Sequence, residues 1–324
     1  MNLAAILFLF VLGIILIVKG GDYFVDASSW IATVSGIPKL IIGATIVSLA
    51  TTMPEMLVSM MAALQGKVDM SIGNAVGSVT ANIGLIMAIS LLFMPGSIRR
   101  MDYLPKAALM MTAALIIVIG GFQGQVSIPM SIILLAIFVV FIFENINSAK
   151  RTMAAESLDN SSPKRSLPPR NEIFVNLAKF VLGAVGIVAG ADLLVDNGSE
   201  LARIVGVSER IIGVTIVAIG TSLPELVTTI TAVAKKQSSL SVGNILGANI
   251  LDLSLIMPLC AVVSKKPLPI AQASAQADLP ACLLVGAIAI VPAMISSKFS
   301  RWQGVVLLTV YIAYVIITCF FMGA

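Results

Sequence analysis

The chain has 324 residues, of which 58% are apolar and 11% are charged, and its formal net charge is +4. A soluble domain of this length needs more charged residues to cover its surface, so the composition excludes ordinary soluble classes and indicates a polytopic membrane protein. The small net charge does not suggest a nucleic-acid partner, and the lack of histidine excludes imidazole as metal ligand, proton shuttle or catalytic base.

Long apolar runs follow one another along the chain, separated by short polar breaks. Because a membrane span needs about 20 residues, division at these breaks predicts ten spanning helices. In chain order they cover residues 3–19, 38–64, 70–94, 103–121, 126–146, 173–190, 210–234, 240–263, 276–296 and 302–322. Amphipathic stretches, "GDYFVDASSWIATVSG" and "GADLLVDNGSELARIVG", extend the first and the sixth helix. The predicted fold class is an all-α membrane protein.

The first apolar run lacks the basic segment that opens a signal peptide, and its "FVLG" recurs at residues 180–183. We therefore expect this run to remain in the protein as a helix. Cys260, Cys282 and Cys319 lie in or beside apolar segments without the spacing of metal ligands. We expect the cysteines to be packing residues.

The two halves of the chain are copies at a constant spacing of 170 residues, which separates Glu55 from Glu225 and the first glycine of "GNAVG" from that of "GNILG". About a third of the positions are identical between residues 43–87 and 213–257, with no gap. Five helices per half is an odd number, so the second half must enter the membrane inverted. The sequence thus predicts two inverted-topology repeats of five helices.

The only long polar segment, residues 147–172, is rich in Ser, Pro and charge and too poor in apolar residues to fold alone. We interpret it as a linker between a first repeat, residues 1–146, and a second repeat, residues 173–324. If the N-terminus is outside, twelve loop Lys and Arg residues fall on the cytoplasmic side and five on the other. This bias predicts both termini outside and the linker in the cytoplasm.

Each half carries a proline followed by a glutamate inside an apolar run, as "ATTMPE" at residues 50–55 and "GTSLPE" at residues 220–225. Proline has no N–H, so Pro54 and Pro224 are expected to free a backbone carbonyl one turn earlier. At membrane depth such carbonyls are tolerated only where a polar group uses them. Hydroxyls and a carboxylate stand beside them in each copy: Thr51, Thr52 and Glu55, and Thr221, Ser222 and Glu225.

The next helix of each half adds a second polar element. In "GNAVGSVTANIG", Ser78 and Asn82 are four residues apart on one helix face, and their equivalents in the other half are Ala248 and Asp252. Sets of carboxylate, hydroxyl and carbonyl oxygens suit hard cations such as Ca²⁺, and Na⁺ uses the same hydroxyls and carbonyls. These residues therefore predict a cation site between the halves.

Structural explanations remain open for several of these residues. A single membrane glutamate often serves as a hydrogen-bonding group in a helix interface, but a symmetric pair with prolines and hydroxyls favours function, because burying carboxylates is costly. Helix packing explains each Ser or Thr equally well when it is taken alone. Asn82 and Asp252 also have a structural alternative, and Asp22, Asp26, Asp192 and Asp196 lie near helix ends, where capping is at least as good an explanation.

At these motifs the chain resembles the cation/calcium exchanger superfamily, and within it the prokaryotic sodium/calcium exchangers, over nearly its whole length. The resemblance rests on "GTSLPE" and on "GNAVGSVTAN" with "GNILGANILD". It implies antiport of Ca²⁺ against Na⁺ by alternating access in a prokaryotic inner or plasma membrane, without a cofactor or enzymatic activity. The implied ion ligands are Thr51, Thr52, Glu55, Ser78, Asn82, Thr221, Ser222, Glu225 and Asp252, with the carbonyls of Ser48 and Ala218.

The chain departs from the family pattern in three places. The first motif reads "ATTMPE" instead of "GTSLPE", although its hydroxyls are kept. Val79 replaces an asparagine, and Ala248 stands where a serine often supplies a hydroxyl, which puts one Na⁺ site and the coupling ion in question. Proton-coupled relatives typically carry a glutamate where this chain has Gly77 and Gly247, which favours Na⁺. The alternatives are a cation/H⁺ antiporter of the same fold, a cation channel, and an intramembrane hydrolase, for which no water-activating motif is present.

Overall fold

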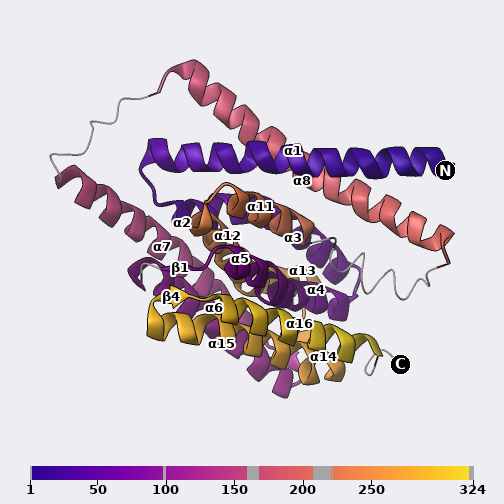
Figure 1. Cartoon of the computed structure of the whole chain (residues 1–324). Coiled ribbons are helices and arrows are strands. Elements are labelled where there is room, and N and C mark those ends of the chain that lie inside the picture. The colour runs from indigo at the N-terminus through magenta and orange to yellow at the C-terminus, as the bar shows by residue number, and fades with distance from the viewer. Residues whose placement is uncertain (1, 98–99, 159–167, 207–219, 221, 321–324) are drawn as a thin grey trace.

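The computed structural model describes residues 2–97, 100–158, 168–206, 220 and 222–320. These residues are almost entirely helical, as Figure 1 shows, and the strands are pairs of two residues each. The predicted all-α class is therefore confirmed.

The elements before residue 160 form one series of helices joined by short connections. They are α1 (Leu3–Ser35), α2 (Lys39–Ile42), the π-helical segment η1 (Gly43–Val47), α3 (Ser48–Leu64), α4 (Val68–Ala81), the π-helical segment η2 (Asn82–Met87), α5 (Ala88–Phe93), β1 (Gly96–Ser97), α6 (Arg100–Phe122), β2 (Gln125–Val126) and α7 (Ile128–Leu158).

The elements after residue 169 follow a similar order. They are α8 (Arg170–Ile204), α11 (Leu223–Ala234), α12 (Ser238–Leu251), the π-helical segment η4 (Asp252–Ile256), α13 (Met257–Ser264), β3 (Leu268–Pro269), α14 (Gln272–Gln276), α15 (Asp278–Ser296), β4 (Lys298–Phe299) and α16 (Arg301–Phe320).

Nine continuous helical stretches among the described residues are long and apolar enough to cross a membrane, and α11 is a shorter apolar helix. Nine of the ten predicted spans match these stretches. The seventh prediction, residues 210–234, coincides with α11 in its second part, and its first part lies mostly outside the described residues.

Two predicted boundaries differ from the structure at the centre of the chain. The fifth helix was expected to end at residue 146, yet α7 continues to Leu158, and α8 begins at Arg170. The extension "NSAKRTMAAESL" is poor in apolar residues but rich in Ala, Lys, Arg, Met and Glu, which favour helix without a membrane around them. Apolar content marks where a helix leaves the bilayer, and helix propensity decides where it ends.

The two prolines lie in different local structures, and only Pro224 differs from expectation. Helix α3 runs without a break through Pro54. Pro224 lies in the first turn of α11, where a missing N–H leaves no backbone acceptor unpaired, and Ser222 precedes this helix as its N-cap. The irregular backbone of the first half is instead the π-helical segment η1, directly before α3.

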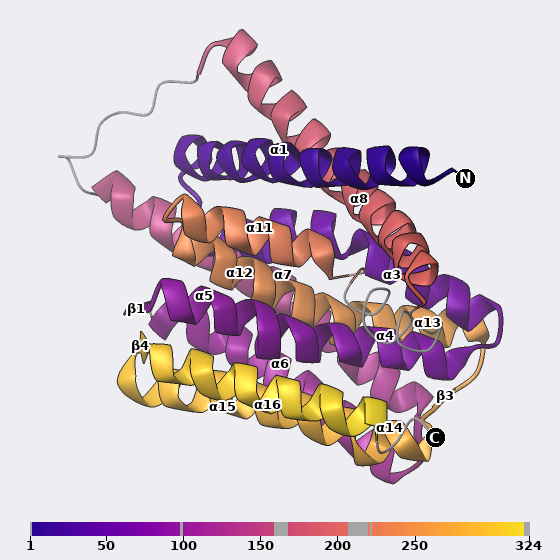
Figure 2. The ribbon, with the colours of Figure 1, turned by 45° about the vertical axis from the view of Figure 1, so that its right-hand side comes forward.

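The helices form layers, which Figures 1 and 2 show from two directions. Helices α1 and α8 lie along one side of the molecule, α15 and α16 lie on the opposite side, and α3, α4, α11 and α12 lie between them. The first turn of α1 and the last turn of α16 lie on the same side of the molecule in both views. This order leaves the proline-bearing helices in the middle of the structure.

Helices α1 and α8 pack against each other through glycines. A Cβ at Gly13 would lie 2.9 Å from the carbonyl oxygen of Gly190, and one at Gly20 would lie 2.9 Å from that of Gly183. Small residues let membrane helices approach to backbone contact. Because Gly183 and Gly190 are the equivalents of Gly13 and Gly20 at the spacing of 170 residues, the two contacts are reciprocal.

A second pair of reciprocal contacts lies in the core. Ser71 donates a hydrogen bond to Cys260 Sγ at 3.0 Å, and Ser241 pairs with Ser90 at 3.2 Å. Residue 241 is equivalent to 71, and residue 260 to 90, so the same positions meet in both directions.

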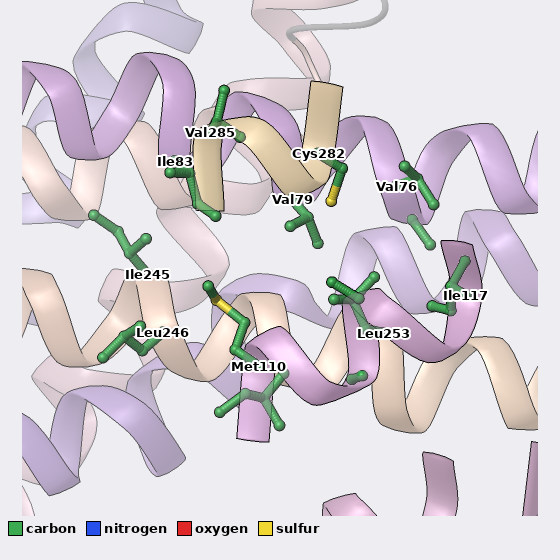
Figure 3. Packing of buried hydrophobic residues seen from close by; sticks show 14 of the residues in the cluster. Val76, Val79, Ile83, Met110, Ile117, Ile245, Leu246, Leu253, Cys282 and Val285 are labelled. Carbon is green, nitrogen blue, oxygen red and sulfur yellow. The ribbon is translucent and has the colours of Figure 1, made fainter. Parts of the chain in front are cut away.

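Apolar residues from the middle helices and from the α15 side form the main core. Figure 3 shows Val79 of α4 between Cys282 of α15 and Met110 of α6, with Leu253 of η4 and Val76 of α4 farther along the same core. All five residues are at most 4% exposed. This packing fixes α4, α12 and η4, which carry the polar residues described next.

Candidate ion-binding site

Glu55 and Glu225 are fully buried in the middle layer. Glu55 lies on α3 and Glu225 in the first turn of α11, and each is 0% exposed. Thr52 of α3 donates a hydrogen bond to Glu225 Oε1 at 3.0 Å, so a hydroxyl of the first half contacts the carboxylate of the second. The two predicted motifs therefore meet in space.

Asn82 and Asp252 each open a π-helical segment. Asn82 is the first residue of η2 and Asp252 is the first of η4, and both side chains are fully buried. Such wider turns occur often at functional sites. Nothing in the hydrophobic pattern indicates them, but their recurrence at equivalent positions links them to the same role in each half.

The predicted hydroxyls connect these groups. Ser78 Oγ lies 3.4 Å from Ser222 Oγ, and Asn82 Nδ2 points to Ser78 Oγ at 3.5 Å. Thr51 donates at 3.3 Å to Asn244 Oδ1 and also to the carbonyl of Ser48 at 3.3 Å. Ser78, Asn82 and Ser222 thus form one buried polar row between the halves.

Several acceptor oxygens in this region have no hydrogen-bond partner among the described residues. They are both carboxylate oxygens of Glu55, both of Asp252, Oε2 of Glu225 and Oδ1 of Asn82. The carboxylate of Glu55 lies within electrostatic range of Glu225 and Asp252. Burying polar groups without partners costs several kcal/mol, of the order of 2 to 7 for each neutral group and more for charges. A bound cation, or protonation of the carboxyl groups, would remove this cost.

The described side chains hold no group of three or more carboxylates, cysteines or histidines arranged around one metal ion. The polar groups that lie around these carboxylates are hydroxyls, amides and backbone carbonyls. That donor set suits Na⁺ and Ca²⁺ better than a transition metal, which prefers nitrogen or sulfur.

Two of the predicted ligands, Thr221 and Ala218, lie outside the described residues. The structure brings together Thr52 and Glu225, and Ser78 with Asn82 and Ser222. The first half of the predicted set is described completely and the second half in part.

Sequence reasoning did not assign a role to three amides, of which Asn74 is half-buried and Asn244 and Asn249 are fully buried. Asn74 Nδ2 donates to Ser59 Oγ at 2.9 Å and to the carbonyl of Glu55 at 3.3 Å. Its equivalent Asn244 accepts from Thr51, and Asn249 accepts from Asn82. The asparagine shared by "GNAVG" and "GNILG" was a signal for the first two. The repeat gave no signal for Asn249, because Val79 stands at the equivalent position, and its signal was the asparagine of the family pattern.

Comparison with known proteins places this chain among membrane transporters. A family model described as "Sodium/calcium exchanger protein" matches residues 5–146 and 175–320. "Sodium/calcium exchanger MaX1" of Methanosarcina acetivorans is 30% identical, over 94% of this chain and 96% of that protein. "Uncharacterized membrane protein MJ0091" of Methanocaldococcus jannaschii is also 30% identical, over 94% of both chains.

A solved structure has the same fold over nearly the full length. It is the sodium-calcium exchanger NCX_Mj soaked with 2.5 mM Na⁺ and 10 mM Sr²⁺, with a TM-score of 0.81 and 27% identity. The match covers 96% of this chain and 98% of that one.

Proposed function

Because the chain belongs to the sodium/calcium exchanger protein family, we propose that it exchanges Ca²⁺ against Na⁺ across a prokaryotic inner membrane by alternating access. The observation that carries this proposal is a group of buried acceptor oxygens, on Glu55, Glu225, Asp252 and Asn82, to which no described residue donates a hydrogen bond. Burying these oxygens without a partner is unfavourable, and a bound cation offsets that free-energy cost.

We assign the central charge to Glu55 and Glu225, with one carboxylate from each half. Two carboxylates balance one Ca²⁺, and hydroxyls and carbonyls complete six to eight oxygen ligands. The remaining proposed ligands are Thr51, Thr52, Ser78, Asn82, Thr221, Ser222 and Asp252, together with the carbonyls of Ser48 and Ala218.

Coupling follows from competition for the same oxygens. A site with Glu55 and Glu225 exposed to one side and without cations holds uncompensated negative charge, which opposes passage through the apolar middle of the protein. Ca²⁺ alone, or Na⁺ ions alone, neutralise the carboxylates enough for the site to change sides. Exchange then requires one cation to leave before the other is carried back.

The inverted repeat is supported by reciprocal contacts. Gly13 with Gly190 and Gly20 with Gly183, like Ser71 with Cys260 and Ser90 with Ser241, exchange places at the spacing of 170 residues. A two-fold relation between halves produces such pairs. We propose a first repeat at residues 1–146 and a second at 173–324, joined by the segment 147–172, with the ion site at the midplane.

The moving element is proposed to be the layer of α1 and α8. It lies on one side of the middle helices in Figure 2 and contacts α11 through Lys235, which lies 3.2 Å from Asp22 Oδ1 and 2.9 Å from Asp26 Oδ2. Sliding of this layer would open the ion site first to one side and then to the other. We further propose that both chain termini face outside, from the distribution of loop Lys and Arg residues.

The test is uptake of radioactive Ca²⁺ into proteoliposomes loaded with Na⁺ and diluted into Na⁺-free buffer, beside K⁺-loaded vesicles. Uptake only with the outward Na⁺ gradient is the expected result. Equal uptake in both vesicle types points to a channel. Uptake that follows an imposed pH gradient instead identifies H⁺ as the coupling ion. This alternative remains because Ala248 lacks the hydroxyl that a serine supplies to one Na⁺ site in the family.

A further inference from the structure

Asn249 of α12 is fully buried and contacts a proposed ion ligand without being one itself. Its Oδ1 accepts a hydrogen bond from Asn82 Nδ2 at 3.1 Å. At the equivalent position of the first half stands Val79, so the copies differ here between an amide and an apolar side chain.

The contact determines which end of the Asn82 amide faces the ion. An asparagine carries two N–H donors at one end and an acceptor oxygen at the other. With Nδ2 directed to Asn249, and more weakly to Ser78 at 3.5 Å, Oδ1 remains buried and has no donor among the described residues. The reverse orientation would present N–H groups to a cation and repel it.

Asn249 is itself held at its other end. Its Nδ2 points to Met110 Sδ at 3.6 Å, and Met110 lies in the apolar core beside Val79, as Figure 3 shows. A thioether sulfur accepts hydrogen bonds but does not donate them, so this contact favours the orientation in which Asn249 Oδ1 faces Asn82.

The difference between the halves follows the chemistry of the two ligands. Asp252, the equivalent of Asn82, is a carboxylate with two acceptor oxygens, so either orientation offers oxygen to a cation. It needs no acceptor to fix its orientation, and the residue that corresponds to Asn249 is the apolar Val79, which is 1% exposed. The amide partner occurs only where the ligand is an amide.

We propose that Asn249 is a positioning residue, which orients Asn82 so that its oxygen, and not its amide nitrogen, faces the bound cation. This inference rests on the proposed function for the identity of the cation. It predicts that the effect of residue 249 depends on residue 82 being an asparagine.

A double-mutant cycle tests this dependence. Asn249→Leu keeps the volume but removes the acceptor, and it is compared in the wild-type background and in Asn82→Asp, whose carboxylate has no donor end. The readout is the rise in melting temperature of the purified full chain in detergent, titrated separately with Na⁺ and with Ca²⁺ against choline. In the wild-type background we expect Asn249→Leu to raise the half-saturating cation concentration about tenfold, the effect of one hydrogen bond. In the Asn82→Asp background we expect a change below about twofold on the same basis.

Two further variants keep the test decisive if Asn249→Leu folds poorly. Met110→Leu conserves volume and removes the sulfur acceptor, so it should weaken cation binding in the same direction and again only when residue 82 is Asn. Val79→Ala, at the equivalent position, is the matched control and should leave the half-saturating concentration unchanged. Equal effects of Asn249→Leu in both backgrounds would overturn the positioning role.

Different measurements test the proposed function and the positioning role of Asn249. Vesicle uptake without a Na⁺ requirement in the wild-type protein would refute sodium coupling. The cycle reports on cation binding by the detergent-purified protein and does not depend on transport.

Discussion

A methyl group added at Gly247 tests whether backbone contact between α12 and the first half supports the ion site. A Cβ at Gly247 would meet the carbonyl oxygen of Ala44 and would lie 2.5 Å from Ser48 Oγ and 2.7 Å from the carbonyl carbon of Ala44. Ala44 lies in η1, and Ser48 opens α3, which carries Thr52 and Glu55. The new methyl group therefore pushes on the segments that lead to the proposed ligands.

The size of the effect follows from these distances. Carbon atoms pack at about 3.5 to 4.0 Å, so α12 must retreat from Ala44 by roughly 1 Å. Overpacking of this kind costs about 1 to 3 kcal/mol, while replacing a helical glycine by alanine returns about 1 kcal/mol of helix propensity. The fold should survive, but a displacement of about 1 Å at a site of fixed geometry lowers activity by about 100-fold.

The assay is the initial rate of Na⁺-driven Ca²⁺ uptake in proteoliposomes with matched protein content. Gly96→Ala is the control, because a Cβ at Gly96 meets no described heavy atom within 4 Å. We expect Gly247→Ala to lose at least about nine tenths of the uptake rate, on the conservative side of that estimate, and Gly96→Ala to keep the wild-type rate. Wild-type uptake by a folded Gly247→Ala protein would refute the argument that close approach of these helices holds the site.

Three further predictions follow from the charged groups. Glu225→Gln removes one of the two central charges and should reduce Na⁺-driven Ca²⁺ uptake to the level of protein-free vesicles; uptake that persists would contradict the charge-balance mechanism. Lys106 is fully buried and lies 2.7 Å from Glu144 Oε2, whose side chain is 19% exposed. Lys106→Met leaves this carboxylate unpaired and should destabilise the protein in thermal unfolding by about 1 to 3 kcal/mol, and a second substitution, Glu144→Leu, should restore most of this loss. Partial burial of Lys235 opposes its charge, but its hydrogen bonds to two α1 aspartates prevail and raise its pKa above the usual 10.5. The group therefore stabilises the fold below pH 10.5 and loses this effect as pH rises through the raised pKa. Lys235→Gln should cost about 0.2 to 1 kcal/mol at pH 8, and this cost should shrink as pH rises through that pKa, measured by thermal unfolding.

The membrane spans were predictable because a bilayer imposes a length and a polarity on every helix that crosses it. The same rule does not place helix ends outside the bilayer, which explains why α7 passes residue 146 and reaches Leu158. The π-helical segments that begin at Asn82 and Asp252 have no compositional signal. One additional residue per turn changes which side chains face inward without changing how apolar the segment is.

The repeat made part of the candidate site predictable. Glu55 and Glu225 stand out because each is a carboxylate inside an apolar run. Their equivalent positions in the two halves favour a functional explanation over a chance occurrence. Asn249 could not be recognised in this way, since its role depends on a neighbour in space, Asn82, that lies 167 residues away in sequence. A comparison of the two halves for identical residues reveals candidate ligands that both halves share. It does not reveal a residue, such as Asn249, that contacts a candidate ligand in one half only.

The differences between the halves are therefore as informative as the identities. The proline-bearing motifs keep two hydroxyls and a glutamate in both copies, whereas the next helix differs at each of three polar positions, which are Ser78, Val79 and Asn82 in one half and Ala248, Asn249 and Asp252 in the other. Two identical halves would offer the same ligands to both sides of the membrane. Any difference in ion affinity between the inward-facing and outward-facing states must then originate at positions where the copies diverge. Among the proposed ligands, the positions that change between hydroxyl, amide and carboxylate lie on α4 with η2 and on α12 with η4. We infer that these helices contribute to the asymmetry, while the glutamates of α3 and α11 supply the charge that both halves share.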